Sequence, residues 1–431
     1  MNTMKVMKFC QNTAFYLLFG MLFLLPFHAF GSTVLNYGYG LADVFGTASV
    51  VSMWKEFVII ILTLLLGLKF FLERKFPKFD ILDKLIIAYF LFGILHAILL
   101  KIDLSQLVWG ARYDYVFLCT FMIVRHFKFD KEQTKKLFKS VIIGGALSLI
   151  LGYILHYLIK PENLTVLGFR DDWSTWYPGQ SLAFCQRMEN QELCRMSGTF
   201  AGPNQFGAYL AMFIPILYMW RKEVKERIKD TSLRRGIPIA LISLAFYALI
   251  QTYSRGALIG VFIAIFVLLS YEYNLWKHIK KKHFLFGLIG IVVVSAVLLI
   301  TIGDTLIRPE STSGHIAAWI MGIQEMFAHP LGQGLGSAGP ASYRFANPII
   351  PESWYLQVGI ELGFFGLLLF LGILVLTIKK LFQARNTALL ASFLGVLAIA
   401  FFLHTFEDSA VSITLFSLLG LKPSKVNKIG P

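Results

Sequence analysis

The sequence contains few charged residues for its length. Only 15% of its 431 residues are Asp, Glu, Lys or Arg, whereas soluble domains carry about 25%. Hydrophobic residues make up 56% of the chain, and the mean hydropathy is +0.66. This composition excludes an ordinary water-soluble enzyme. An aromatic share of 15% also excludes a disordered tail protein.

Cysteine is scarce, and several familiar motifs are missing. Four cysteines rule out a disulfide scaffold, and none forms a CxxC pair for zinc. The chain has no GxxxxGK[ST] nucleotide loop, no HExxH and no GxSxG. No repeat of 20–50 residues is evident. We therefore predict no metal site and no nucleotide-binding loop.

Long apolar runs are what the chain has in abundance. A run of about 17–25 residues is long enough to cross a bilayer and must be helical there. The sequence predicts an all-α, polytopic membrane protein with about 12 transmembrane helices, the first of them an uncleaved helix. The predicted spans are 12–30, 56–72, 84–100, 104–124, 140–159, 204–220, 237–253, 256–272, 284–303, 354–378, 387–403 and 408–421.

The basic residues predict the orientation of these spans. Connections 73–84, 125–139, 221–236, 272–283 and 379–387 are rich in Lys and Arg, and they fall on one side if twelve spans alternate. Both termini fall on that side too, and it is cytoplasmic by the positive-inside rule. The net charge of +15 is therefore interpreted as a topology signal. We expect contact with membrane lipids and no nucleic-acid partner.

Two long connections, 160–203 and 304–353, then lie outside the membrane. They separate three groups of predicted transmembrane helices, 1–159, 204–303 and 354–431. Cys185 and Cys194 both lie in the first outer loop. A disulfide between them and two free thiols are both compatible with their spacing. Cys10 and Cys119 are expected to be small apolar fillers.

Two arginines lie at the predicted outer surface. Arg195 ends the first outer loop, in the segment Arg-Met-Ser-Gly-Thr-Phe before Pro203 and Asn204. Arg255 lies in a tight turn between two spans. A guanidinium there can grip a diphosphate with two hydrogen bonds. The alternatives are a lipid anchor for Arg195 and a carboxylate neighbour for Arg255.

The second outer loop contains an amphipathic pattern. Apolar residues at Ile316, Trp319, Ile320, Ile323 and Met326 predict a helix on the outer surface that stops before Pro330. His315 is expected at the start of this helix, either as a functional group or as a solvated side chain.

Glu352 opens the next predicted span at the water boundary. It is either a general base that takes a proton from a substrate hydroxyl or a carboxylate near the N-cap. Glu361 follows about 13 Å further along the helix, within the membrane, so it must be paired or functional. Arg112 and Asp114 pose the same question on another span. They face different sides of one helix and need partners elsewhere.

In these segments the chain resembles the O-antigen ligase/polymerase-like membrane family. The matching blocks run in order from Arg195 to Gly363: Arg195-x-Ser-Gly-Thr-Phe-x-x-Pro-Asn204, Ser-Arg255-Gly, Ser-Gly-His315-x-x-x-Trp319, Pro-Leu-Gly-x-Gly-Leu-Gly336 and Glu352-Ser-x-Tyr355-Leu-x-x-x-x-x-Glu361-x-Gly363. Together they cover roughly residues 195–375.

The resemblance implies transfer of a glycan from a polyprenyl-diphosphate lipid, such as undecaprenyl diphosphate, at the outer face of the cytoplasmic membrane. It implies no metal or nucleotide-sugar cofactor, with possible partners in a flippase and a chain-length regulator. Arg195 and Arg255 are then candidates for the diphosphate, and Glu352 or His315 for the base. Asn204, Trp319 and Tyr355 are candidates for glycan contacts, as is Trp354.

Two departures from the family's ligases favour a polymerase. Those ligases commonly have a His-Asn pair where this chain has Glu352–Ser353, and often Arg where it has His315. The alternatives are a ligase with a lipid A-core or protein acceptor, and a glycolipid transporter without catalysis.

Overall fold

The computed structural model describes residues 3–41, 50–74, 77–159, 161–170, 180–188, 193–227, 232–273 and 309–421. The described chain is mostly helical, as expected from the apolar runs, with one two-stranded hairpin. The predicted span 284–303 lies outside the described residues, as do Trp173, Trp176 and Tyr177 of the first outer loop.

The N-terminal half supplies two groups of helices. The first contains α1 (Thr3–Leu24), η1 (Leu25–Phe27), α2 (His28–Thr33), η2 (Val34–Gly38), η3 (Val50–Met53) and α4 (Trp54–Glu73). The second contains α5 (Ile81–Leu99), α6 (Leu104–Asp114), α7 (Val116–Phe127), α8 (Lys131–Tyr153), η4 (Ile154–Leu158) and α9 (Pro161–Thr165).

The C-terminal half begins with the hairpin of β1 (Gln186–Arg187) and β2 (Cys194–Arg195). Its helices are α10 (Pro203–Arg227), α11 (Ser232–Gln251), α12 (Arg255–Glu272), α16 (Pro309–Ala328), α17 (Gly339–Ser342), α18 (Trp354–Gln383), α19 (Thr387–Ile399), η5 (Thr405–Glu407) and α20 (Ser409–Gly420).

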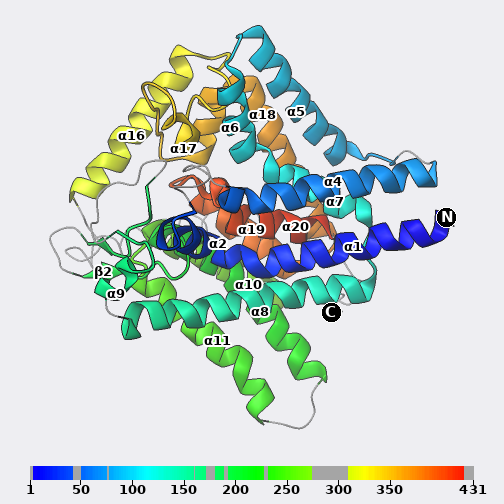
Figure 1. Ribbon diagram of the computed structural model, residues 1–431, viewed down its shortest axis with the longest axis vertical. Coiled ribbons are helices and arrows are strands. Elements are labelled where there is room, and N and C mark those ends of the chain that lie inside the picture. Colours follow the sequence, from blue (N-terminus) through cyan, green and yellow to red (C-terminus); the bar gives the residue numbers. More distant parts are fainter. Residues whose placement is uncertain are drawn as a thin grey trace.

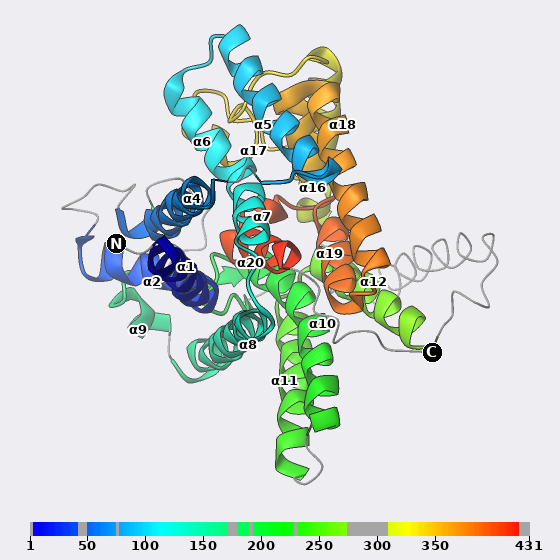
Figure 2. The ribbon, with the colours of Figure 1, turned by 90° about the vertical axis from the view of Figure 1, so that its right-hand side faces the viewer.

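The helices pack in layers around a central group. Helices α1, α4 and α8 lie side by side, with α1 in contact with both of the others (Figures 1 and 2). Helix α10 contacts α11, α12 and α19, while α7 packs on α20 and α5 on α18. Large aromatic side chains fill the centre, because Phe117, Trp354, Phe406 and Phe416 are almost fully buried.

The two predicted sides of the molecule are separated in space. The N-terminal end of α1, the C-terminal end of α4 and the N-terminal end of α5 lie at one end of the molecule in Figure 1. Helices α9 and α16 and strand β2, which belong to the predicted outer loops, lie at the opposite end. The structure therefore brings both long outer segments to one end, where they can build a common site.

Apolar length alone supports fewer spans than the twelve predicted. Five of the described helical segments are long and apolar enough to cross a membrane, or six if the bent pair α6 and α7 is one span. That pair bends by 55°, near the point where Arg112 and Asp114 interrupt the apolar run. Three of the predicted spans correspond to shorter apolar stretches: Gly236–Gln251 within α11, Thr387–Ile399 and Ser409–Gly420.

Helix α18 is broken where the sequence shows one continuous apolar run. Gly363 has a φ of 67°, which is outside the helical range. The break frees backbone groups that must be satisfied by protein inside a membrane. The segment that follows α16 supplies them, because the Phe364 amide donates to the Pro330 carbonyl (3.0 Å) and the Gly334 amide donates to the Glu361 carbonyl (2.7 Å). A Cβ atom on Gly363 would lie 2.5 Å from the Leu331 carbonyl carbon, so only glycine fits.

The outer loop before α10 is tied down at several points. Cys185 and Cys194 form a disulfide, with Cα atoms 5.4 Å apart, across the antiparallel β1–β2 pair. This resolves the alternative left open by the spacing. The Thr199 hydroxyl donates to the Pro26 carbonyl at 2.7 Å, and the Met196 amide donates to the Gln251 carbonyl at 2.9 Å. The end of this loop is therefore fixed against α8, α11 and the N-terminal helices.

Candidate active site

A central cavity of about 530 Å³ lies where segments from both halves of the chain meet. Its volume is in the range of small-molecule sites. The lining combines cations, carboxylates, imidazoles and aromatic rings. The polar and aromatic lining residues relevant to its chemistry are His28, Lys55, Glu56, Trp109, Arg112, Tyr113, Gln180, Gln186, Asn204, Gln205, Arg344, Glu352, His404, Glu407 and Asp408.

The two candidate bases, Glu352 and His315, form a pair. His315 Nδ1 lies 3.1 Å from Glu352 Oε2, because α16 packs against α18. Glu352 lines the cavity, and its second carboxylate oxygen has no hydrogen bond among the described residues. The backbone of Glu352 has a φ of 52°, an uncommon conformation for a residue other than glycine. The pairing therefore holds one face of the carboxylate and leaves the other open to the cavity.

Two expectations about this pair need correction. The N-cap of α18 is Ser353, and the Glu352 carboxylate bonds to His315 instead of capping the helix. His315 was expected at the start of its helix, but α16 already begins at Pro309. His315 therefore lies in the second turn, from which its ring reaches Glu352.

The pKa of Glu352 reflects opposing effects. Burial would raise it, but the hydrogen bond and charge of His315, with a smaller contribution from His404, lower the pKa below its usual value. A carboxylate with a lowered pKa is ionised at neutral pH and can accept a proton.

His404 is a cavity residue that was not selected from the sequence. Burial lowers the pKa of His404 to about 4, so the ring is neutral at pH 7. Its Nδ1 lies 2.6 Å from Gln357 Oε1, which can only accept, so Nδ1 carries the proton. The Gln357 amide nitrogen donates to Asp114 Oδ1 at 3.2 Å. The buried Asp114 is thus partnered from another helix, as the sequence required.

Glu361 also has protein partners. Its Oε1 accepts from the amides of Gly336 (3.0 Å) and Ala338 (3.4 Å), while its Oε2 is buried without a hydrogen-bond partner among the described residues. Gly336 has a φ of 81°, which points this backbone toward the carboxylate. The glycine-rich segment therefore holds a buried carboxylate and crosses the break in α18.

Arg195 is buried and is engaged by the protein. Its Nε donates to the Thr252 carbonyl at 2.9 Å, and its terminal NH2 group donates to Asn204 Oδ1 at 2.9 Å. Asn204 lines the cavity, whereas Arg195 is not among the lining residues. Arg195 thus joins the outer loop to the α11–α12 turn and orients Asn204 at the cavity wall.

Arg255 is the first residue of α12, three positions after the carbonyl that Arg195 binds. The structure therefore brings the chain segments of the two predicted diphosphate ligands together. Arg255 is partly exposed and, like Arg195, is not among the residues that line the cavity.

The aromatic candidates pack against other protein groups. Trp354 is fully buried and contacts Phe117 and Phe406, so its expected role in stacking on a sugar is wrong. The Tyr355 hydroxyl donates to the Leu397 carbonyl at 2.9 Å. Trp319 stacks on Phe402 at 6.1 Å. Neither Tyr355 nor Trp319 lines the cavity.

A cationic wall is the second feature not selected from the sequence. Arg112 donates to Glu56 Oε1 at 2.6 Å, and Lys55 Nζ lies 3.3 Å from the same oxygen. Arg344 stacks 3.6 Å over the centre of the Trp109 ring. The charge of Arg112 inside an apolar run was a signal for this wall. Arg344 lies in a loop rich in glycine and alanine, and no pattern in the sequence marked it as a cavity residue.

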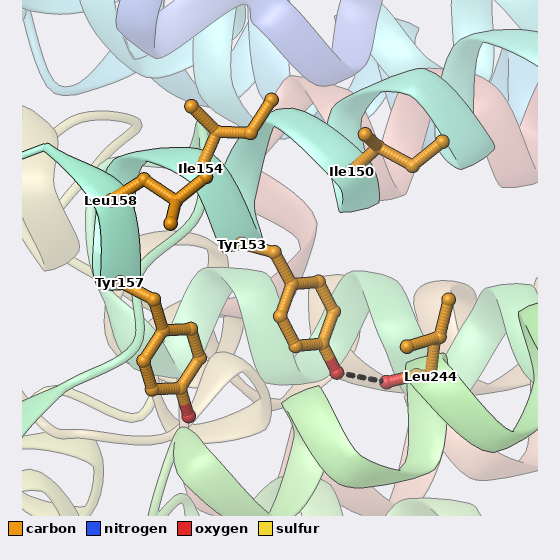
Figure 3. Close-up of a pocket in the computed structure, with 6 residues that line it drawn as sticks. All are labelled: Ile150, Tyr153, Ile154, Tyr157, Leu158 and Leu244. Carbon is orange, nitrogen blue, oxygen red and sulfur yellow. Dashed lines mark hydrogen bonds between the residues drawn. The ribbon is translucent and has the colours of Figure 1, made fainter.

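The described residues contain no group of three or more His, Cys, Asp or Glu side chains arranged to hold a metal ion. A second hollow, of about 350 Å³, lies between α8 with η4 and α11. Figure 3 shows its six lining residues, which are all Ile, Leu or Tyr, with the Tyr153 hydroxyl donating to the Leu244 carbonyl at 2.7 Å. It offers an apolar surface and no acid or base.

Comparison with known proteins supports the resemblance in the sequence. Residues 240–371 match the family described as O-Antigen ligase. The match includes Arg255, His315, the glycine-rich segment and Glu352. A search of curated proteins finds no match. The family match confirms the resemblance to O-antigen ligase/polymerase-like proteins over this part of the chain. The described helices that are long and apolar enough to cross a membrane are those expected of a membrane protein.

Proposed function

We propose that the protein polymerises oligosaccharide repeat units carried on a polyprenyl diphosphate into a surface polysaccharide such as O-antigen, capsule or exopolysaccharide. The observation that carries this proposal is the Glu352–His315 pair at the wall of a polar cavity, inside the region that matches the O-antigen ligase family. A lipid diphosphate donor already carries its leaving group, so the protein must mainly position an acceptor, remove its proton and neutralise charge.

In the proposed step, an acceptor hydroxyl oxygen bonds to the anomeric carbon of the donor. The bond from that carbon to the diphosphate oxygen breaks, and the diphosphate leaves with the electron pair. The proton of the hydroxyl passes to the open oxygen of Glu352, which His315 keeps in place. Such a positioned base contributes typically about 10²–10⁴-fold to a rate.

Arg195 and Arg255 are proposed to stabilise the departing diphosphate. The hydrogen bond from Arg195 to Thr252 supports this, because it places β2 beside the turn that leads into Arg255. Trp319 and Tyr355 are proposed to line an outer extension of the glycan path, while Asn204 contacts the glycan within the cavity.

The proposed membrane is the cytoplasmic membrane, with both termini in the cytoplasm and residues 160–203 and 304–353 outside. A flippase and a chain-length regulator are proposed partners. Reporter fusions at Lys229 and Gly339 test the orientation. The expected result is a cytoplasmic signal at Lys229 and an extracytoplasmic one at Gly339, and the reverse result would refute the topology.

Two alternatives keep specific support. The family match supports a ligase that transfers the finished glycan to lipid A-core or another acceptor. The buried Asp114 and Glu361 side chains support a glycolipid transporter, since ionisable groups inside a membrane mark transport pathways. Their bonds to Gln357 and to the Gly336 and Ala338 amides give them a structural explanation as well.

Deletion of the gene followed by glycolipid gel analysis separates these functions. A polymerase predicts loss of the ladder with retention of a single-repeat band. A ligase predicts loss of all attached glycan. Loss of glycan that is restored by a Glu352→Gln variant would favour transport without catalysis, and an unchanged gel would refute all three.

A further inference from the structure

The cavity has a corner in which an arginine guanidinium lies over an indole ring. The Arg344 guanidinium carbon is 3.6 Å from the Trp109 ring centre, and both residues line the cavity. Stacking of this kind holds the guanidinium plane while its N–H donors point outward from the edge. Arg344 is therefore held over the ring at the cavity wall.

This guanidinium has no carboxylate partner among the described residues. Its Nε is buried and lacks a hydrogen bond there. The neighbouring Arg112 stands 5.0 Å from the same ring, but Glu56 compensates its charge. A partly buried, uncompensated cation is costly, and an anion arriving in the cavity would remove that cost. The corner is thus built for an anionic group.

The rest of this surface has the character of a sugar site. The Trp109 indole is partly exposed in the cavity, and the side-chain amides of Gln180, Gln186 and Gln205 line it too. Amides donate to and accept from hydroxyl groups, and an indole offers an apolar surface to the C–H face of a pyranose. These groups suit a ring with hydroxyls more than a bare phosphate.

We propose that the Arg344–Trp109 corner binds the carboxylate of an acidic sugar, so that the glycan this protein handles contains a uronic acid or a similar anionic residue. The inference rests on the proposed function, because it names the substrate class of that same cavity. The carboxylates of Glu352 and Asp408 on the same cavity favour a monoanionic sugar over a diphosphate at this position, since they would repel the higher charge more strongly.

A binding experiment on the full-length protein in nanodiscs tests the proposal without requiring turnover. The probes are trigalacturonate, its fully methyl-esterified form and inorganic pyrophosphate, each titrated calorimetrically. We expect trigalacturonate to bind and the ester to bind at least about tenfold more weakly. Arg344→Gln should weaken trigalacturonate binding about 10- to 100-fold, the usual range for a hydrogen bond to a charged group. Arg344→Lys should restore only part of it, because an ammonium lacks the planar fork.

Arg221→Gln is the matched control. Arg221 also lies over an aromatic ring, that of Tyr218, at 6.0 Å, but it is not among the cavity-lining residues. The Arg221→Gln variant should bind trigalacturonate like the unaltered protein. An equal loss of trigalacturonate binding in Arg221→Gln and Arg344→Gln would overturn the proposal.

The other contrary results are equally specific. Equal binding of acid and ester, or wild-type binding by Arg344→Gln, would overturn the acidic-sugar assignment. Binding of pyrophosphate that depends on Arg344, without binding of trigalacturonate, would reassign the corner to the donor diphosphate and overturn it as well. If trigalacturonate binds through Arg344 but purified protein never extends a lipid-linked glycan, the corner is supported and the polymerase function fails.

Discussion

Arg195 and Arg344 illustrate two ways in which this molecule uses an arginine. Arg195 is buried at the junction of the outer loop with α10 and α11, and it donates to Thr252 and Asn204. Arg344 lies on Trp109 at the cavity wall and has no acidic partner among the described residues. The first guanidinium is largely occupied with protein acceptors, whereas the second lines the cavity and has a buried Nε without a hydrogen bond among the described residues.

The carboxylates divide in the same way. Glu361 is fully surrounded by protein and accepts from the amides of a glycine-rich segment. Glu352 bonds to His315 with one oxygen and lines the cavity. The comparison separates polar groups that lie behind the cavity wall and contact protein from polar groups that line the cavity. We refer to the first kind as held groups, Arg195 and Glu361, and to the second as open groups, Arg344 and Glu352.

The largest expected effect concerns the open carboxylate. Glu352→Gln keeps the size of the side chain but cannot take up a proton, so glycan extension by purified protein should fall about 10²–10⁴-fold. Glycolipid binding should be nearly unchanged, since the defect appears only in the transition state. His315→Ala should lower the rate less, because it removes a positioning partner.

The comparison breaks if the two variants behave in the opposite way. Near-normal extension by Glu352→Gln together with an inactive His315→Ala would make His315 the base and Glu352 its partner. If both variants stay active, the acceptor needs no side-chain base, and the open carboxylate has another role.

The next effect concerns the held arginine. Arg195→Ala would leave the buried Thr252 carbonyl without this donor, at about 1–3 kcal/mol, whereas the Asn204 amide oxygen at the cavity wall can be solvated. We expect a lower midpoint in thermal unfolding of detergent-solubilised protein and loss of polymer, with poor rescue by Arg195→Lys. Arg344→Gln is the control and should not lower the midpoint. Equal midpoints for both variants would remove the distinction between held and open arginines.

Arg255 extends that test to the proposed diphosphate site. Arg255→Ala should abolish polymer while the protein stays in the membrane, and Arg255→Lys should rescue poorly. Full chain length and yield with lysine at both Arg195 and Arg255 would mean that general electrostatics suffice, and the two-bond grip on diphosphate would then be wrong.

A smaller effect is expected from the disulfide that closes the loop around the held arginine. Cys185 and Cys194 are nine positions apart, and closing so short a loop contributes about 2–3 kcal/mol in a chain-entropy account. Cys185→Ser should therefore lower the unfolding midpoint and partly reduce polymer yield, because β2 carries Arg195. Cys119→Ser is the matched control, since Cys119 is a free thiol. Equal midpoints for the two variants would show that other bonds alone hold the loop.

The sequence predicts the helical class well, because bilayer-length apolar runs have few alternatives. It cannot reveal the break in α18, since residues 354–378 read as one apolar run and the break is satisfied by backbone from Pro330 and its neighbours. The candidates Glu352 and His315 were found from their position at the water boundary, but their contact depends on how α16 packs on α18. Arg195 was also selected as a candidate from the sequence. Its hydrogen bond to the backbone carbonyl of Thr252 could not be predicted, because a backbone acceptor does not depend on residue type. Arg344 and Trp109 are far apart in the sequence, and only the folded chain brings the guanidinium over the indole ring.

The smallest effect is a change in pH dependence, and it tests how His315 acts on the open carboxylate. Glu352 must be ionised to accept a proton, so activity should be present above its pKa and lost as pH falls through it. Because His315 lowers this pKa against the effect of burial, the acid limb of kcat should lie below pH 4.5, the ordinary value for glutamate. In His315→Ala the effect of burial persists without the opposing hydrogen bond and charge, so the pKa rises and the limb moves to higher pH.

His329→Ala is the matched control, since His329 Nε2 lies 3.8 Å from a different carboxylate, Glu325, and should leave the limb in place. The measurement is the pH profile of glycan extension by purified protein between pH 3.5 and 8, roughly the span needed to define a carboxylate limb. If the acid limb stays in place in His315→Ala, this histidine does not control the ionisation of Glu352.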